Sequence, residues 1–327
     1  MARSIRLPET GACNSKIPAV QADPSQPMPG IPTRPYAHRR SLLLAAASLP
    51  LLGACGAWPA AQRAHATADV RLRALEASLD GRLGVYAVDT GSDAALVYRG
   101  DERFPLCSTF KVVLAGAILD RSVREPGLLE QRIRYAASDL VSYSPITQTQ
   151  VSDGMTIAAL CAAALRYSDN TAANLLLKLV GGPAGLTSHA RAQDDSTFRL
   201  DRWETDLNTA EPGDLRDTST PQAMALTMQR LCLGDLLPAP QRLQLQDWLR
   251  GNTTGGTRIR AGVPASWQVG DKTGTGSYGT ANDIALAWPP QRAPLVIAIY
   301  TTSHRQDAEA RNDILASAAR VCVDALG

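Results

Sequence analysis

Along residues 67–327, strand and helix patterns follow one another in an order that few folds can accommodate. Strand patterns occur near both ends of this region, at 83–88, 94–98, 267–273, 284–288 and 295–302. A helical period fills the middle and also opens and closes the region, which predicts helices at 68–79, 110–119, 157–165, 171–180, 221–231 and 307–326. The order predicts an α+β fold, in which an antiparallel sheet is flanked by the N- and C-terminal helices and carries an inserted all-helical domain.

This pattern also divides the chain. Residues 67–107 and 250–327 are expected to form the sheet domain, and residues 108–249 the helical domain. A functional site is expected between the two, where both can supply side chains. No internal repeat occurs.

Residues 1–66 have the composition of an export leader. They carry a net charge of +5, and His38-Arg39-Arg40-Ser41 precedes thirteen mostly apolar residues at 42–54. A basic segment before a short apolar run is typical of a secretory signal, and the paired arginines indicate the twin-arginine route. Two processing events are possible: lipidation of Cys55 at a lipobox, or cleavage after Ala66. Met28 is an alternative start of translation. We therefore expect a periplasmic protein, either soluble or lipid-anchored.

Charge and hydropathy exclude two classes of partner. The whole chain carries +2, so residues 67–327 carry 2 − 5 = −3, without a basic run, which argues against nucleic acid. No apolar stretch reaches the roughly 18–20 residues of a membrane-spanning helix. We expect no transmembrane span.

Four cysteines lie beyond the leader: Cys107, Cys161, Cys232 and Cys322. An oxidising compartment permits disulfides between them in three arrangements, and four buried thiols are the alternative. Only two histidines accompany them, and C-x-x-C spacing is absent. We therefore expect no metal site.

Lysine is rare, since only four of the 33 basic residues are Lys. Lys111 follows Ser108 by three residues in an apolar segment, so both would share one helix face. An amine desolvated there loses basicity and can take a proton from the hydroxyl. The alternative is a serine cap followed by a lysine that extends to solvent.

A second lysine and a polar triplet complete the candidate chemistry. Lys272 lies in Asp271-Lys272-Thr273-Gly274-Thr275-Gly276, where the glycines permit a ligand to approach the strand closely. Its amine and the hydroxyls could hold an anion, and an edge strand protected by lysine is the alternative. Ser168-Asp169-Asn170 precedes a helix, where simple capping is the alternative.

Taken together and in order, Ser108-x-x-Lys111, Ser168-Asp169-Asn170 and Lys272-Thr273-Gly274 resemble the class A serine β-lactamases of the penicillin-recognising serine enzymes. The spacings are 60 residues from Ser108 to Ser168 and 164 to Lys272. Residues 202–208 match the Ω-loop of that family, expected here at 199–217 and closed by an Arg202–Asp217 ion pair. The resemblance extends over residues 67–327 and implies the family's α+β fold, with the active site between its two parts.

The resemblance implies a role for each catalytic residue. Ser108 would be acylated by the β-lactam, while Lys111 and Ser168 relay protons and Ser168 protonates the departing lactam nitrogen. Glu204 would activate the water that hydrolyses the acyl-enzyme, with Asn208 as a second support. Whether Glu204 or Lys111 is the acylation base is disputed for the family and stays open here. The implied function is hydrolysis of penicillins and cephalosporins, which confers β-lactam resistance.

The substrate-binding residues follow from the same resemblance. The backbone N–H groups of Ser108 and Thr275 would form the oxyanion hole. Arg258 would supply the cation that many relatives place on the strand after K-T-G, where this chain has Ala281. The full expected set is Tyr143, Asn170, Asn208, Arg258, Lys272, Thr273 and Thr275. No cofactor is implied, and a monomer is expected.

Departures from the family bear on the substrate range. Cys107 matches a branch in which a disulfide after K-T-G-T accompanies carbapenem hydrolysis, but Gly276 stands at the partner position. Cys161 likewise faces Ala115 in place of a cysteine. These departures argue against carbapenem hydrolysis, whereas penicillins and early cephalosporins are expected. Thr275 and Ser277 make turnover of broader cephalosporins a further hypothesis.

Two rival functions share parts of this motif set. A penicillin-binding transpeptidase or carboxypeptidase has the Ser, Lys, S-x-N and K-T-G residues but lacks a deacylating carboxylate at the place of Glu204. A non-catalytic β-lactam sensor would be acylated once without turnover. Glu204 and Asn208 argue against both. A Ser-His-Asp hydrolase is disfavoured because G-x-S-x-G is absent.

Overall fold

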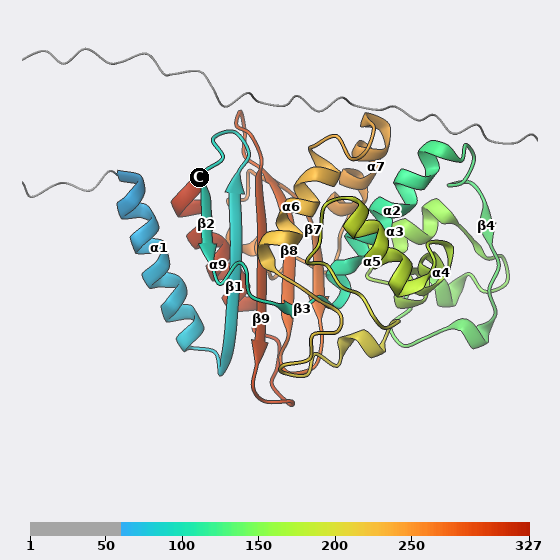
Figure 1. The fold of residues 1–327 in the computed structure, drawn as a ribbon, viewed down its shortest axis with the longest axis horizontal. Coiled ribbons are helices and arrows are strands. Elements are labelled where there is room, and N and C mark those ends of the chain that lie inside the picture. Colours follow the sequence, from blue (N-terminus) through green and yellow to red (C-terminus); the bar gives the residue numbers. More distant parts are fainter. Residues whose placement is uncertain (1–59) are drawn as a thin grey trace, which may run out of the picture. The chain divides into compact units, whose positions relative to one another are not determined.

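The segments with strand patterns form one antiparallel sheet in the order β2-β1-β9-β8-β7 (Figure 1). The structure is a computed structural model that describes residues 60–327. Strands from the two ends of the chain meet at its centre, where Val85 pairs with Ile299. The strands are β1 (Gly81–Asp89), β2 (Ala95–Tyr98), β7 (Gln268–Thr275), β8 (Ala281–Trp288) and β9 (Leu295–Ser303).

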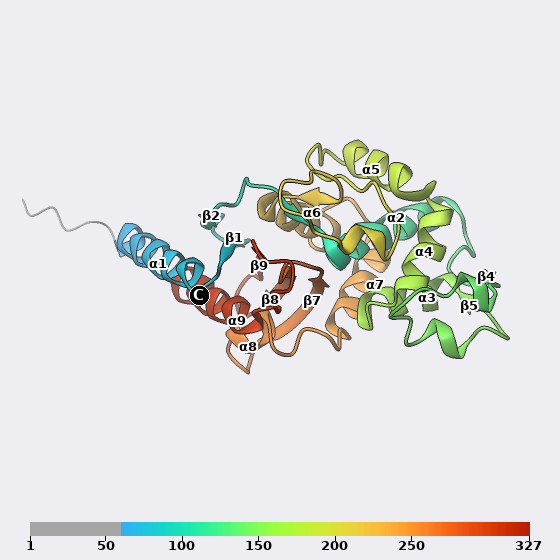
Figure 2. The same cartoon turned by 90° about the horizontal axis from the view of Figure 1, so that it is seen from below.

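Both terminal helices cover one face of this sheet, as predicted (Figure 2). They are α1 (Ala60–Ala77) and α9 (Asn312–Leu326), and the short helix α8 (Ile259–Gly262) packs beside α9. Their apolar sides enclose one core, which includes Leu72, Leu83, Ile297 and Leu315. Helix α9 begins later than the expected residue 307, because the Tyr278 N–H donates to Gln306 O and ties the preceding segment to the turn after β7.

The inserted helices form a second core on the opposite face. Helix α6 packs against β9 and β1, and α7 packs against β7. Phe110, Phe198 and Tyr300 are buried in this core with many leucines. The helices are α2 (Phe110–Arg124), α3 (Ile157–Arg166), α4 (Asn170–Leu179), α5 (Gly182–Ala192), α6 (Pro221–Cys232) and α7 (Ala239–Arg250).

Short elements shape the connections between these helices. Two-residue strands pair as β3 (Phe104–Pro105) with β6 (Thr218–Ser219), and as β4 (Arg132–Ile133) with β5 (Met155–Thr156). Single 3-10 turns cover Cys107–Thr109, Ala137–Asp139, Thr147–Thr149 and Asp206–Asn208. Side-chain caps fix three helix starts, where Thr156, Asp169 and Thr220 accept N–H groups of α3, α4 and α6.

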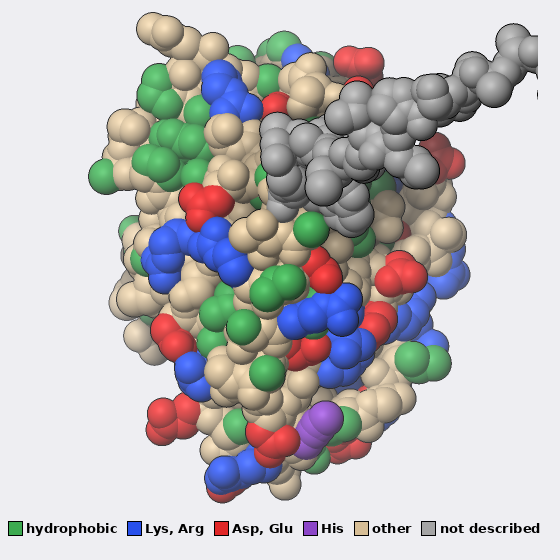
Figure 3. Space-filling view, turned by 90° about the vertical axis from the view of Figure 1, so that its left-hand side faces the viewer, with side chains coloured by type: hydrophobic (Ala, Val, Ile, Leu, Met, Phe, Trp, Pro, Cys, Tyr) green, Lys and Arg blue, Asp and Glu red, His purple; other side chains and the backbone are tan. Residues whose placement is uncertain are grey.

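The exposed face at the left of Figure 1 mixes charges of both signs (Figure 3). Arg71 pairs with Asp324 and links α1 to α9, while Arg311 pairs with Asp313. Exposed pairs of this kind contribute at most about 1 kcal/mol each. Because positive and negative side chains are paired, this face carries no extended patch of one charge.

Some predictions fall outside the described residues, among them the twin-arginine pair, the alternative start at Met28 and the lipobox cysteine Cys55. The last residues of the predicted leader, from Ala60, form the start of α1. Within residues 60–327 no helix is both long and apolar enough to cross a membrane. Cys107, Cys161, Cys232 and Cys322 are all free and buried, so the thiol alternative holds for the described part of the chain.

Candidate active site

Ser108 lies in the 3-10 turn directly before α2, at the junction between helices and sheet. Its turn is anchored from the sheet side, because Thr109 Oγ1 lies 3.0 Å from the Tyr300 hydroxyl and donates to Leu106 O. Asn282 Nδ2 donates to the carbonyls of Pro105 and Leu106, directly before this turn. Ser108 is 8% exposed, so this anchored turn presents a nearly buried hydroxyl.

Lys111 is fully buried, and its amine has three close acceptors. Nζ donates to Ser168 O at 2.8 Å and to Asn170 Oδ1 at 2.7 Å, and lies 3.0 Å from Glu204 Oε1. Burial lowers the pKa of Lys111, and the neighbouring Glu204 carboxylate opposes that shift.

Ser108 and Lys111, which the sequence places on one helix face, both contact the same third group. Ser108 Oγ donates to Glu204 Oε1 at 3.2 Å, and the Lys111 amine meets the same oxygen. One carboxylate oxygen from a loop 96 residues away therefore joins hydroxyl and amine, which helical spacing alone could not show.

Ser168 and Lys272 form the opposite side of the site. Lys272 is fully buried on β7, where Nζ donates to Ser168 Oγ at 3.0 Å and to Thr273 O at 2.7 Å. Burial, followed by the nearby Lys111 charge, lowers the pKa of Lys272 well below its ordinary value of 10.5. Asp169 caps α4, whereas Ser168 and Asn170 point their polar atoms at Lys111.

Glu204 is held from both sides of its carboxylate and by its backbone. Asn208 Nδ2 donates to Oε2 at 2.6 Å, opposite the oxygen that Ser108 and Lys111 share. Asn174, for which sequence analysis assigned no role, accepts from Glu204 N at 3.0 Å and donates to Glu204 O at 2.8 Å. In the sequence, Asn174 is recognisable only as a polar residue within the apolar run of α4.

The loop that carries Glu204 is closed by the predicted ion pair. Arg202 Nε lies 2.5 Å from Asp217 Oδ2, and Asp217 Oδ1 accepts the backbone N–H groups of Asp201 and Arg202. Asp217 is 1% exposed. Both ends of the loop therefore depend on one buried carboxylate.

The expected carboxylate-binding residues lie around the end of β7. Arg258 contacts Thr275 there and does not face the site directly. It is largely buried and donates to Gly274 O, Asn282 O and Thr275 Oγ1, each at 2.7 Å. Thr275 is exposed, while Thr273 is buried and contacts Thr254. Arg258 thus reaches the site through the Thr275 hydroxyl.

Two further predicted residues lie in the same region. Asn170 joins the site to the neighbouring loop, because its side chain donates to Ser142 O and its backbone to Tyr143 O. Tyr143 has a positive φ of 59° and a side chain that is 60% exposed. Its backbone is therefore fixed beside Asn170 while its ring stays accessible.

Asn282 is a residue that sequence analysis missed. It pairs with Gly274 across β7 and β8, and its Nδ2 donates to Pro105 O at 2.8 Å and Leu106 O at 3.2 Å. The Asn282→Ala variant leaves these buried carbonyls with fewer donors, at a cost of about 1–3 kcal/mol. We expect kcat/KM for benzylpenicillin to fall about 10-fold or more with a smaller change in KM, measured by steady-state kinetics. An unchanged kcat would contradict this role.

Gly276 lies beside Cys107, where sequence analysis excluded a bridge. A Cβ at Gly276 would lie 2.7 Å from Cys107 Sγ and 2.7 Å from Asn208 O. Gly276→Cys should therefore form a disulfide with Cys107 after a small shift of the Asn208 carbonyl. We expect the oxidised variant to be more stable than Gly276→Ser by roughly 2–4 kcal/mol, a difference that reduction abolishes. Two titratable thiols at these positions under oxidising conditions would contradict the prediction.

A family model described as the β-lactamase enzyme family matches residues 67–326, nearly all of the part that the structure describes. The chain therefore belongs to this family of hydrolases that open cyclic amides. The resemblance of its motifs to the class A enzymes is confirmed by the similar proteins.

Among these relatives, β-lactamase AST-1 of Nocardia asteroides is 54% identical over 300 residues, covering 89% of this chain and 97% of that protein. The carbapenem-hydrolyzing β-lactamase KPC of Klebsiella oxytoca is 53% identical over 291 residues, covering 89% and 98%. The solved β-lactamase structure from Desulfarculus baarsii DSM 2075 has a TM-score of 0.78 and 60% identity, over 79% of this chain and 96% of that one.

Proposed function

We propose that this protein hydrolyses the β-lactam amide of penicillins and cephalosporins through an acyl-Ser108 intermediate, and that Glu204 activates the deacylating water. The observation that carries the proposal is the position of the Glu204 carboxylate. Its Oε1 reaches the Ser108 hydroxyl and the Lys111 amine, and its Oε2 is held by Asn208. A base in contact with the nucleophile and fixed by a neighbour suits two successive proton transfers.

Acylation begins with the Ser108 hydroxyl. Its proton passes to Glu204 Oε1, Oγ bonds to the lactam carbonyl carbon, and the C–N bond breaks as Ser168 gives its proton to the nitrogen. Lys111 restores the Ser168 proton across 3.5 Å and takes the Glu204 proton across 3.0 Å. The net result moves the Ser108 proton to the lactam nitrogen and leaves Glu204 ionised. The backbone N–H groups of Ser108 and Thr275 stabilise the developing oxyanion.

Deacylation uses the same carboxylate. Glu204 takes a proton from water, the hydroxyl oxygen bonds to the acyl carbon, and Ser108 Oγ leaves with the proton returned by Glu204. Asn208 Oδ1 is buried and has no partner among the described residues, so it can accept a hydrogen bond from this water. Its Nδ2 holds Glu204 Oε2. Asn208 therefore supports both the base and the water.

Substrate recognition falls to the end of β7. The Lys272 ammonium, with the hydroxyls of Thr273 and Thr275, binds the substrate carboxylate, and the buried Arg258 strengthens the site through Thr275. Asn170 and Tyr143 contact the remainder of the substrate. Arg258 contributes less binding free energy than it would in a direct ion pair, because Thr275 lies between its guanidinium and the ligand.

Binding of this carboxylate should depend on pH through Lys272. Its pKa in the folded enzyme is lowered, so the ammonium is present below that pKa and is lost as the pH rises through it, well before 10.5. We expect KM for benzylpenicillin to rise as the pH rises through the lowered pKa of Lys272, below 10.5. Lys272→Arg should give a flatter profile because Arg stays protonated. A flat KM in the unaltered enzyme would contradict this prediction.

The proposed substrate range is tested with three drugs. Initial rates on benzylpenicillin, cephalothin and imipenem are compared for the purified protein. Rapid turnover of the first two and slow turnover of imipenem would support the proposal. KPC is named for carbapenem hydrolysis, yet Gly276 of this chain cannot bridge Cys107. Imipenem turnover as fast as that of benzylpenicillin would overturn this part of the proposal.

Export completes the proposal. The Arg39-Arg40 leader would direct the enzyme to the periplasm, where hydrolysis protects cell-wall synthesis and confers β-lactam resistance. Fractionation of expressing cells tests this, with Cys55→Ala to separate the alternatives. Release of the enzyme from the membrane fraction only in this variant indicates a lipoprotein, whereas a soluble protein in both cases indicates cleavage near Ala66.

A further inference from the structure

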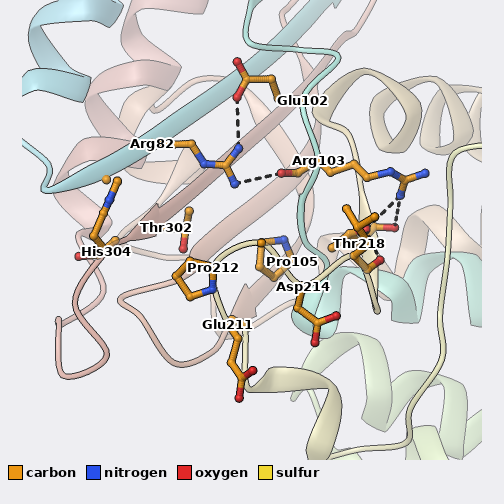
Figure 4. A pocket seen from close by; sticks show the side chains of 15 residues that line it. Arg82, Glu102, Arg103, Pro105, Glu211, Pro212, Asp214, Thr218, Thr302 and His304 are labelled. Atoms are coloured by element: carbon orange, nitrogen blue, oxygen red, sulfur yellow. Dashed lines mark hydrogen bonds and ion pairs between the residues drawn. The ribbon is translucent and has the colours of Figure 1, made fainter.

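A cavity of about 350 Å³ lies between the second half of the Ω-loop and the sheet, outside the proposed active site (Figure 4). The loop segment 210–215 forms one wall. The start of β1, the end of β9 and β3 form the others. Among the described residues no backbone hydrogen bond joins 210–215 to β1 or β9, so the cavity separates these parts.

The walls of this cavity have two chemical characters. Pro105, Pro212, Leu215 and Ala210 form an apolar part. Polar groups gather on the sheet side. They are the Arg82 guanidinium, the His304 imidazole and the Thr302 hydroxyl.

These polar groups retain unused donors. Arg82 donates to Glu102 and to Arg103 O, which leaves three of its five N–H groups free. Thr302 is 8% exposed and accepts from Thr280, so its own hydroxyl proton is available. The His304 side chain has no hydrogen bond to the described residues.

The acidic residues at the rim of the cavity leave these hydrogen-bond donors available. Glu102 is paired with Arg99 as well as Arg82, and Asp214 with Arg216. Glu211 is exposed, and its carboxylate points away from Arg82 in Figure 4. Donors therefore dominate the side of the cavity that faces the sheet.

We propose that this cavity is a binding site for a small organic carboxylate with an apolar body. The carboxylate contacts Arg82, His304 and Thr302, and the body packs between Pro105 and Pro212. The site is independent of the proposed hydrolysis. Its occupant touches the loop that also carries Glu204 and Asn208.

The test titrates phenylacetate into the ¹⁵N-labelled full chain and follows amide shifts by NMR. We expect shifts at Gly213, Thr302 and His304 with a Kd on the order of 1 mM, the range of a ligand with few atoms. Benzyl alcohol should bind at least about 10-fold more weakly, and benzylamine should not shift these amides.

Variants separate this cavity from the carboxylate site at Lys272. Arg82→Met combined with His304→Gln should weaken the shifts at Gly213 about 10-fold or more, while Arg305→Gln, which removes an exposed neighbouring charge, should leave them unchanged. His304→Gln alone serves if the double variant unfolds. Shifts confined to residues around Lys272, equal binding of benzyl alcohol, or equal effects of both variants would overturn the proposal.

Discussion

The Glu204→Gln variant should remain acylated by benzylpenicillin and lose about 10²–10⁴-fold in kcat. Gln keeps the shape of Glu and a contact for Asn208, but it cannot accept the proton of the deacylating water. Ser108 retains a second proton acceptor in Lys111, whose pKa is lowered by burial and which lies beside the same oxygen. Deacylation has no such substitute, so it should become the slow step.

This result is measured by steady-state rates together with the mass of the protein during turnover. Glu211→Gln is the matched control, because it makes the same change at an exposed position of the same loop. That control should keep the rate of the unaltered enzyme. Turnover by Glu204→Gln at an undiminished rate would remove Glu204 from the mechanism.

The Asp217→Asn variant should lower the free energy of unfolding by about 3–5 kcal/mol. Asp217 is buried and accepts two backbone N–H groups and the Arg202 guanidinium. Asn is neutral, so Arg202 loses its principal counter-charge. The Asn amide N–H groups would also face the N–H donors that the Asp217 carboxylate accepts. For a chain of this size the loss corresponds to a fall of roughly 6–20 °C in Tm.

Asp214→Asn supplies the comparison for Asp217→Asn. Asp214 pairs with the half-exposed Arg216 at 2.8 Å and lies 3.7 Å from Arg202, beyond hydrogen-bond distance, so its loss should cost only about 1 kcal/mol. Deacylation should also slow in Asp217→Asn, because the ends of the Ω-loop position Glu204. Equal Tm values for the two variants, measured by calorimetry, would show that the ion pair does not hold the loop.

The sheet could be predicted from apolar runs bounded by turn residues, and most helices from a regular helical period. The β1–β9 pairing joins residues more than 200 positions apart, yet both strands carry continuous apolar runs that predict burial. Helix α7 was missed because its period is poor, with Leu243 60% exposed and several glutamines among its apolar residues. Helix α5 was missed because Gly and Pro occupy its first turn.

The candidate site was predictable as a set of residues and less so as a set of contacts. Motif order and spacing named Ser108, Lys111 and Lys272, but their hydrogen bonds depend on how Glu204 enters from a distant loop. Asn174 and Asn282 carry no motif, although each is a polar residue next to an apolar run. Such residues become recognisable once their buried partners are known.

The most direct test of the account follows the unaltered protein by intact-mass spectrometry during incubation with excess benzylpenicillin. We expect many equivalents of penicilloate per enzyme and a return to the unacylated mass when the substrate is consumed. A protein that stays acylated after one equivalent would contradict this expectation. A penicillin-binding transpeptidase, carboxypeptidase or sensor would then be the correct function.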